Sequence, residues 1–190
     1  MRNVMLLSAR LVLGGYLSVH GAQKLFGVLG GHGLDTTGQA FERIGLTPGR
    51  PMAALAGATE LAGGLLTATG AADPAGPLAI IGAMTVASAT HRANGPLAAS
   101  GGFELPVTNL AAAAALAAAG PGRLSLGRPL PRRLTAVAFA VGGLLAALSL
   151  AKLSTAQQRS AAGQRVPSVP APDEPRVPTE AGDSSAGAQA

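Results

Sequence analysis

Residues 4–25, VMLLSARLVLGGYLSVHGAQKL, are the stretch that decides the fold of this chain. They form an apolar run long enough to cross a bilayer as one α-helix, for which about 17–25 residues are needed. A basic start followed by an apolar run is also typical of a secretory signal peptide. We favour a retained helix, because Arg10 interrupts the apolar core and Val19-His20-Gly21 is a poor cleavage site.

Four more apolar blocks follow the first, at residues 51–71, 76–90, 105–119 and 134–150. Segments rich in glycine and proline separate them and predict turns. Charged residues make up 12% of the 190 residues, about half of the ~25% that is usual in soluble domains. We therefore predict an all-α, polytopic transmembrane four-helix bundle, extended by a fifth transmembrane helix.

The composition also predicts how the chain is divided. Residues 1–127 would form the four-helix membrane domain, and residues 128–153 a basic loop and the fifth helix. Residues 154–190 are too polar to build a core, so we expect a disordered tail. The glycine-rich residues 26–50 would form a loop, with a short interfacial helix near Phe41, Ile44 and Leu46.

The net charge of +5 does not indicate a nucleic-acid-binding protein. Its basic residues lie beside apolar blocks, where they act as topology signals, and one Tyr and four Phe offer little surface for base stacking. The lipid bilayer is therefore the expected partner. The arginine-rich residues 123–133 predict a cytoplasmic N-terminus, although Lys24, Arg43 and Lys152 at the other helix ends favour the opposite orientation. The excess of Ala, Gly, Pro and Arg suggests a bacterial plasma membrane protein.

Ionisable residues in or beside the apolar blocks are the candidate functional residues, because charge inside a membrane is costly and usually faces a cavity or a partner. These residues are Arg10, His20, Lys24, Glu60, His91 and Glu104. Antiparallel helices would bring His20, Lys24, His91 and Glu104 to one side of the bundle. Glu60 would lie ~13 Å along its helix, near the midplane.

Each candidate also has a purely structural interpretation. Arg10 could reach the interface or pair with Glu60, and Glu60 could form a structural ion pair instead of a functional one. Lys24 could anchor a helix end, His91 could end a helix favourably, and Glu104 could start one. His20 and His91 alone are a weak signal for haem or a metal, and we expect neither. The sequence assigns no catalytic residue.

Small residues predict which helices lie closest together. Gly14 and Ser18 share one face of the first block, and Gly57, Glu60 and Gly64 share one face of the second. Small residues allow helices in membranes to approach closely. We therefore expect these two blocks to pack together with Glu60 turned inward.

The order of several short motifs resembles the DoxX family of small bacterial and archaeal membrane proteins. The matching elements are Arg10, Gly21-Ala22-Gln23-Lys24-Leu25-Phe26-Gly27, Glu60-Leu61-Ala62-Gly63-Gly64, Gly70, His91, and Gly120-Pro121-Gly122-Arg123-Leu124-Ser125-Leu126. The resemblance covers about residues 5–127. The chain departs from the family pattern at Gly127, where an aspartate is frequent, and by its fifth helix and tail.

The resemblance implies a four-helix membrane bundle associated with oxidoreductases, either thiosulfate:quinone oxidoreductase or a complex that handles thiols and superoxide. The chain has no cysteine, so it cannot carry out sulfur redox chemistry alone. We therefore expect an accessory subunit that docks a quinone, a soluble oxidoreductase or another membrane subunit, not a complete enzyme. The alternatives are a small transporter with Glu60 and Arg10 in its pathway, and a structural membrane anchor without catalysis.

Overall fold

A computed structural model describes residues 1–163, and every regular element in them is a helix. The helices are α1 (Arg2–Phe26), α2 (Gly33–Arg43), α3 (Gly49–Thr69), α4 (Ala75–His91), α5 (Glu104–Ala119) and α6 (Arg132–Gly163). Two short 3-10 turns, η1 (Arg92–Asn94) and η2 (Ala98–Ser100), connect α4 to α5. The predicted all-α fold is confirmed, and the five apolar blocks correspond to α1, α3, α4, α5 and α6.

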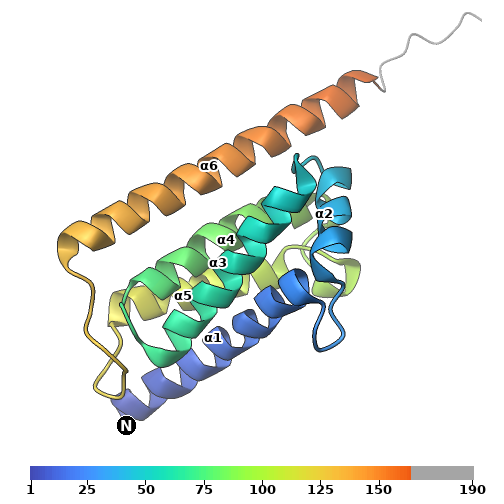
Figure 1. Ribbon diagram of the computed structural model, residues 1–190. Coiled ribbons are helices and arrows are strands. Elements are labelled where there is room, and N and C mark those ends of the chain that lie inside the picture. The colour runs from blue at the N-terminus through green and yellow to red at the C-terminus, as the bar shows by residue number, and fades with distance from the viewer. Residues whose placement is uncertain (164–190) are drawn as a thin grey trace, which may run out of the picture.

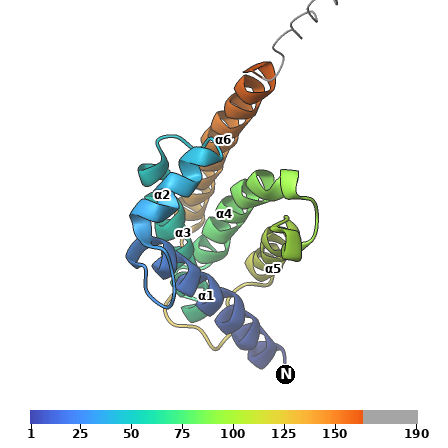
Figure 2. The same cartoon turned by 90° about the vertical axis from the view of Figure 1, so that its right-hand side faces the viewer.

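The first four long helices form an antiparallel bundle. The helix α1 packs along α3, α3 packs on α4, α4 packs on α5, and α5 returns to α1 (Figures 1 and 2). The short helix α2, predicted near Phe41, packs on α3. The long helix α6 packs on α4 and lies on the side of the bundle away from α1 (Figure 1).

The helix α6 extends beyond its predicted end. The predicted tail begins at residue 154, but residues 154–163 continue α6 as far as Gly163, so the prediction is wrong for this segment. Alanine and glutamine in this segment favour the helical conformation, and no proline interrupts it. The rest of the predicted tail, residues 164–190, lies outside the described residues.

The surface of the bundle is apolar, as a membrane protein requires. Two helices are long and apolar enough to cross a bilayer, α1 and residues 132–155 of α6, and α5 is a shorter apolar helix. Far more large hydrophobic side chains are exposed than buried among the described residues, including Val12, Phe139 and Leu144. Such a surface would be unfavourable in water, and lipid would cover it. An all-α membrane bundle accounts for the long apolar helices and for the exposed hydrophobic side chains.

Glycines set the distance between α1 and α3. A Cβ atom on Gly14 would lie 2.5 Å from the carbonyl oxygen of Gly64, and one on Gly21 would lie 2.5 Å from that of Gly57. The two backbones are therefore in contact at two levels, as the small-residue pattern predicts. Ser18, between these levels, is buried and donates its hydroxyl hydrogen bond to Gly14 O at 2.7 Å.

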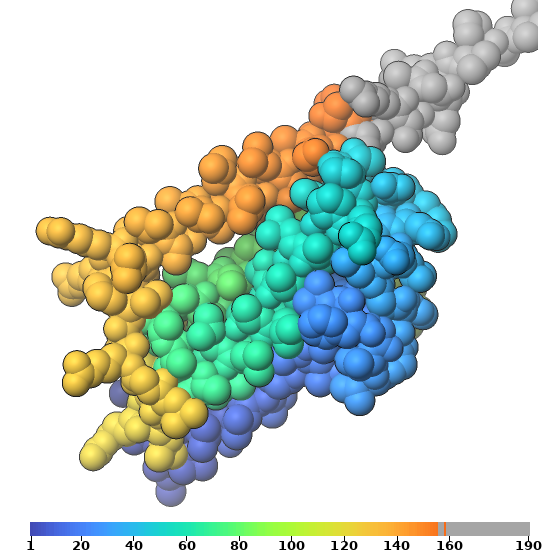
Figure 3. Space-filling model, in the orientation of Figure 1, coloured from blue at the N-terminus to red at the C-terminus, as the bar shows by residue number. Residues whose placement is uncertain are grey.

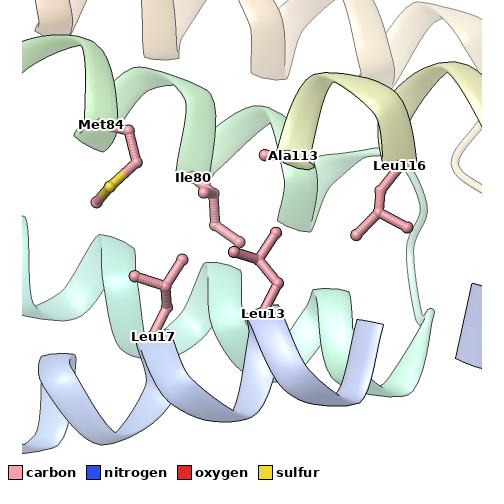
Figure 4. Packing of buried hydrophobic residues seen from close by; sticks show 6 residues of the cluster. All are labelled: Leu13, Leu17, Ile80, Met84, Ala113 and Leu116. Atoms are coloured by element: carbon pink, nitrogen blue, oxygen red, sulfur yellow. The ribbon is translucent and has the colours of Figure 1, made fainter. Parts of the chain in front are cut away.

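The apolar core lies between α1, α4 and α5. Leucines of α1 point towards Ile80 of α4 and towards α5 (Figure 4). The buried residues of this cluster are Leu13, Leu17, Ile80, Met84, Ala113 and Leu116. This core joins the α1–α3 pair to the second half of the bundle.

Replacing Gly14 with alanine should destabilise the bundle, because the added methyl group meets backbone atoms of α3 that cannot rotate away. We expect a loss of about 1–3 kcal/mol, as for other overpacked cores. Gly15 is the matched control, since a Cβ there meets nothing within 4 Å. G15A should leave stability unchanged or raise it by up to ~1 kcal/mol, because alanine favours helix. Equal unfolding midpoints for the two variants in detergent would contradict close α1–α3 contact.

Candidate functional site

An ion pair joins α1 to α3. The Lys24 ammonium, in the last turn of α1, forms a salt bridge with the Glu60 carboxylate from the middle of α3. The Glu60 side chain is 8% exposed and that of Lys24 is 26% exposed. Side chains in a helix lean towards its N-terminus, so two side chains on antiparallel helices converge from opposite directions. The close contact at Gly21 and Gly57 brings the two helices within reach of this pair.

The ion pair lines a cavity of about 380 Å³ between α3, α4 and α6. This volume lies within the range of about 300–1,000 Å³ that is usual for small-molecule sites. Its walls are mainly aliphatic, with Met52 and Leu55 from α3, Val86 from α4, and Val141 and Leu145 from α6. The α6 helix therefore closes a site whose charged residues come from α1 and α3.

The polar residues of the cavity gather towards one end. Lys24 ends α1, His91 ends α4, and Ser149 lies in the second half of α6, so all three lie towards the same side of the bundle. The opposite part of the cavity is lined by Ala75 and Leu78. Phe41, Ile44 and Met52 also line the end that holds Lys24 and His91, so this end offers polar and apolar contacts, whereas the opposite part is aliphatic. Such a cavity suits a ligand with a polar head and an apolar body.

His91 has a defined tautomer. Its Nδ1 lies 2.7 Å from the carbonyl oxygen of Gly101, which can only accept a hydrogen bond. Nδ1 therefore carries the hydrogen, and the Nε2 of the neutral ring is left as an acceptor. His91, which is exposed, lines the same cavity as Lys24.

The remaining candidates at this side do not line the cavity. His20 packs its ring edge-on against Tyr16, with ring centroids 4.5 Å apart. The Glu104 carboxylate accepts a hydrogen bond from the Ala98 backbone nitrogen at 2.9 Å and thereby fixes the α4–α5 connection. Of the candidate cluster, the structure brings Lys24, Glu60 and His91 together. In residues 1–163, no three His, Cys, Asp or Glu side chains gather as a metal site.

Arg10 occupies a different site, at the other end of the bundle. Its side chain is 2% exposed and donates hydrogen bonds to the carbonyl oxygens of Pro121, at 2.5 Å, and Leu124. The alternative that Arg10 pairs with Glu60 is therefore wrong, since Glu60 pairs with Lys24. The absence of a side chain at Gly70 leaves space for the Arg10 guanidinium, because a Cβ atom at position 70 would collide with it. Arg10, Gly70 and residues 120–126, separate in sequence, thus form one structural clamp.

The clamp holds the α5–α6 loop against the α3–α4 turn. Two backbone hydrogen bonds add to it, from Leu126 N to Thr69 O at 2.8 Å and from Leu130 N to Asp73 O at 2.9 Å. Burial raises the pKa of Asp73 in this turn, and the positive charge of Arg10 opposes that shift without forming a direct ion pair. The loop is therefore fixed by several contacts along its length.

Sequence reasoning did not identify the hydroxyl-bearing residues of the cavity wall, Thr59 and Thr90. Threonine in a helix commonly bonds to its own backbone, as Thr90 does with Ala87 O at 2.8 Å, so its presence alone carries no signal. The one signal in the sequence for a hydroxyl in the cavity wall was that Thr59 is adjacent to the candidate residue Glu60.

The buried Lys24–Glu60 pair should contribute more to the free energy of unfolding than an ion pair at the surface does. In a double-mutant cycle with K24M and E60Q, we expect a coupling energy of about 0.5–3 kcal/mol for unfolding in detergent. The exposed Arg50–Asp35 pair, with side chains 68% and 78% exposed, is the control and should couple by less than ~1 kcal/mol. A Lys24–Glu60 coupling no larger than that of Arg50–Asp35 would show that the buried pair does not hold α1 on α3.

Replacing Arg10 with lysine should loosen the α5–α6 loop, because a single ammonium cannot reproduce the two-carbonyl contact of the guanidinium. We expect trypsin to cleave after Arg123 several times faster in R10K than in the unmodified protein. R2K is the control, since Arg2 bonds only to Ala119 O, at 3.1 Å and at the surface. Unchanged cleavage in R10K would mean that the backbone hydrogen bonds alone fix the loop.

The comparisons with known proteins agree with the motifs up to His91, whereas the motif at residues 120–126 lies outside the matched segment. A DoxX family model matches residues 5–93, which comprise α1 to α4 and the start of η1. No curated protein and no solved structure matches the chain. The matched segment contains Arg10, Lys24, Glu60 and His91, and the match supports membership of the chain in the DoxX family.

Proposed function

We propose that this DoxX-family protein is the membrane subunit of a redox system and docks a quinone in the cavity between α3, α4 and α6. The observation that carries the proposal is the Lys24–Glu60 pair, which lies with His91 at the polar end of a mainly aliphatic cavity. A quinone likewise has a polar part, the ring with its two carbonyl oxygens, and an apolar part, the tail.

The residues at the polar end can form hydrogen bonds with both redox forms of the ring, the quinone and the quinol. The Lys24 ammonium has three donors, and after one bonds Glu60 others can serve a quinone carbonyl oxygen. With Nδ1 donating to Gly101 O, the His91 Nε2 can accept a hydrogen bond, or a proton, from a quinol hydroxyl. Glu60 is a positioning residue here, because it holds the Lys24 ammonium in place.

The packing of α6 leaves a path by which the apolar tail of a quinone would extend from the cavity into the lipid. This helix packs on α4 and makes at most slight contact with α3, so the cavity lies beside a loosely packed seam. A tail leaving along this seam would enter the surrounding lipid. Because the chain has no cysteine, the electrons would belong to the quinone, to another bound cofactor or to a partner. A soluble oxidoreductase or a second membrane subunit would be that partner.

We also propose that the protein lies in a bacterial plasma membrane with its N-terminus in the cytoplasm. The support is the stretch from the end of α5 to the first turn of α6, where Arg123, Arg128, Arg132 and Arg133 occur without an acidic residue. Cytoplasmic loops are enriched in arginine and lysine.

The test is to purify the full chain from bacterial membranes and to measure the quinone that remains bound per protein. We expect near-stoichiometric quinone, with at least a tenfold loss in K24M and a several-fold loss in H91Q, since each removes a partner of the ring oxygens. R92Q, at the exposed neighbour of His91, is the matched control and should retain the quinone.

Two outcomes would contradict the proposal. The first is a stable, folded protein that neither co-purifies with a quinone nor binds one when a quinone is added back. The second is equal quinone retention in H91Q, K24M and R92Q, which would place the quinone elsewhere. Co-purification of an oxidoreductase, checked by cross-linking in native membranes, tests the partner separately.

A further inference from the structure

The end of the molecule opposite the polar part of the cavity carries a concentration of positive charge. The arginines of this end are Arg2, Arg123, Arg128, Arg132 and Arg133. Within residues 1–163, none of them pairs with a carboxylate, and the acidic residue at this end, Asp73, is only 8% exposed. Figure 3 shows the yellow segment, around residues 120–135, projecting from this end. An anionic partner would therefore meet little competing negative charge.

The segment that carries these arginines is held in place. Arg10 binds two of its carbonyl oxygens, and Leu126 and Leu130 donate backbone hydrogen bonds to the α3–α4 turn. A fixed loop loses less conformational entropy on binding a ligand than a free one does. The arginines thus sit on a preorganised support.

An apolar groove begins beside these arginines. It has a volume of about 810 Å³ and runs between α4, α5 and the start of α6, lined by Ile81, Ala118, Leu130, Ala136 and Phe139. Arg132 also lines it, at its charged end, together with the mostly buried Asp73 and with Thr135. From Arg132 to Phe139 the helix rises about 10 Å, so the groove descends well below the level of the charges.

We propose that this groove and the arginines beside it form a binding site for an anionic phospholipid. The phosphodiester would meet the guanidinium groups of Arg132 and Arg128, and one acyl chain would lie in the groove. Guanidinium groups bind phosphate oxygens with two parallel hydrogen bonds. A zwitterionic lipid would bring an ammonium group towards the same cluster of positive charges, and a soluble anion would leave the apolar groove unfilled.

The test is native mass spectrometry of the full chain, released from bilayers that contain equal amounts of phosphatidylglycerol and phosphatidylcholine. We expect several-fold enrichment of retained phosphatidylglycerol. R132Q should lower the enrichment by about threefold or more, and R128Q should lower it less. R50Q removes the same charge at the other end of the bundle and should leave the enrichment unchanged.

A second variant tests the groove without changing any charge. Ala118 is exposed and lines the groove, so A118L should fill it and reduce phosphatidylglycerol retention while the unfolding midpoint stays constant. Equal retention of the two lipids would overturn the proposal. So would equal losses in R132Q and R50Q, which indicate diffuse charge, unchanged retention in A118L, or full displacement by soluble glycerol phosphate.

Discussion

The contact between α1 and α3 is the constraint on which the rest of the structure depends. Glycines at two levels allow the two backbones to touch, and Ser18 fills the space between these levels. Without a strong hydrophobic driving force inside lipid, helices associate through such close packing and through polar contacts. Leu13 and Leu17 of α1 then pack against α4 and α5, which gives the bundle its core.

The same contact makes a buried charge tolerable. Removing a carboxylate from water is costly unless a partner and hydrogen bonds compensate, and Lys24 provides that compensation to Glu60 because the two helices lie so close. The pair is thus a consequence of the packing and also the polar end of the cavity. A single interaction therefore connects the stability of the bundle with the site that we propose for a quinone.

The site combines family and non-family parts of the chain. The matched segment, residues 5–93, provides Lys24, Glu60 and His91, whereas α6, outside that segment, provides the aliphatic wall with Val141 and Leu145. The additional helix therefore encloses the cavity and is not a separate anchor at the edge of the bundle. Its first turn also supplies Arg132, so α6 takes part in the features at both ends of the molecule.

The sequence by itself determined the five long helices except for the end of α6, their order and the face on which α1 meets α3, because apolar length and small-residue spacing are local properties of the chain. It also indicated that Lys24 and His91 end helices on the same side. Only the tertiary structure decided the partners: Glu60 pairs with Lys24 and not Arg10, while Arg10 binds the α5–α6 loop. Which charge meets which depends on helix rotation and on loops far apart in sequence, and a spacing rule along one helix contains neither. The tertiary structure also decided the cavity. One of its walls comes from α6, and no local sequence pattern specifies that α6 packs on α4.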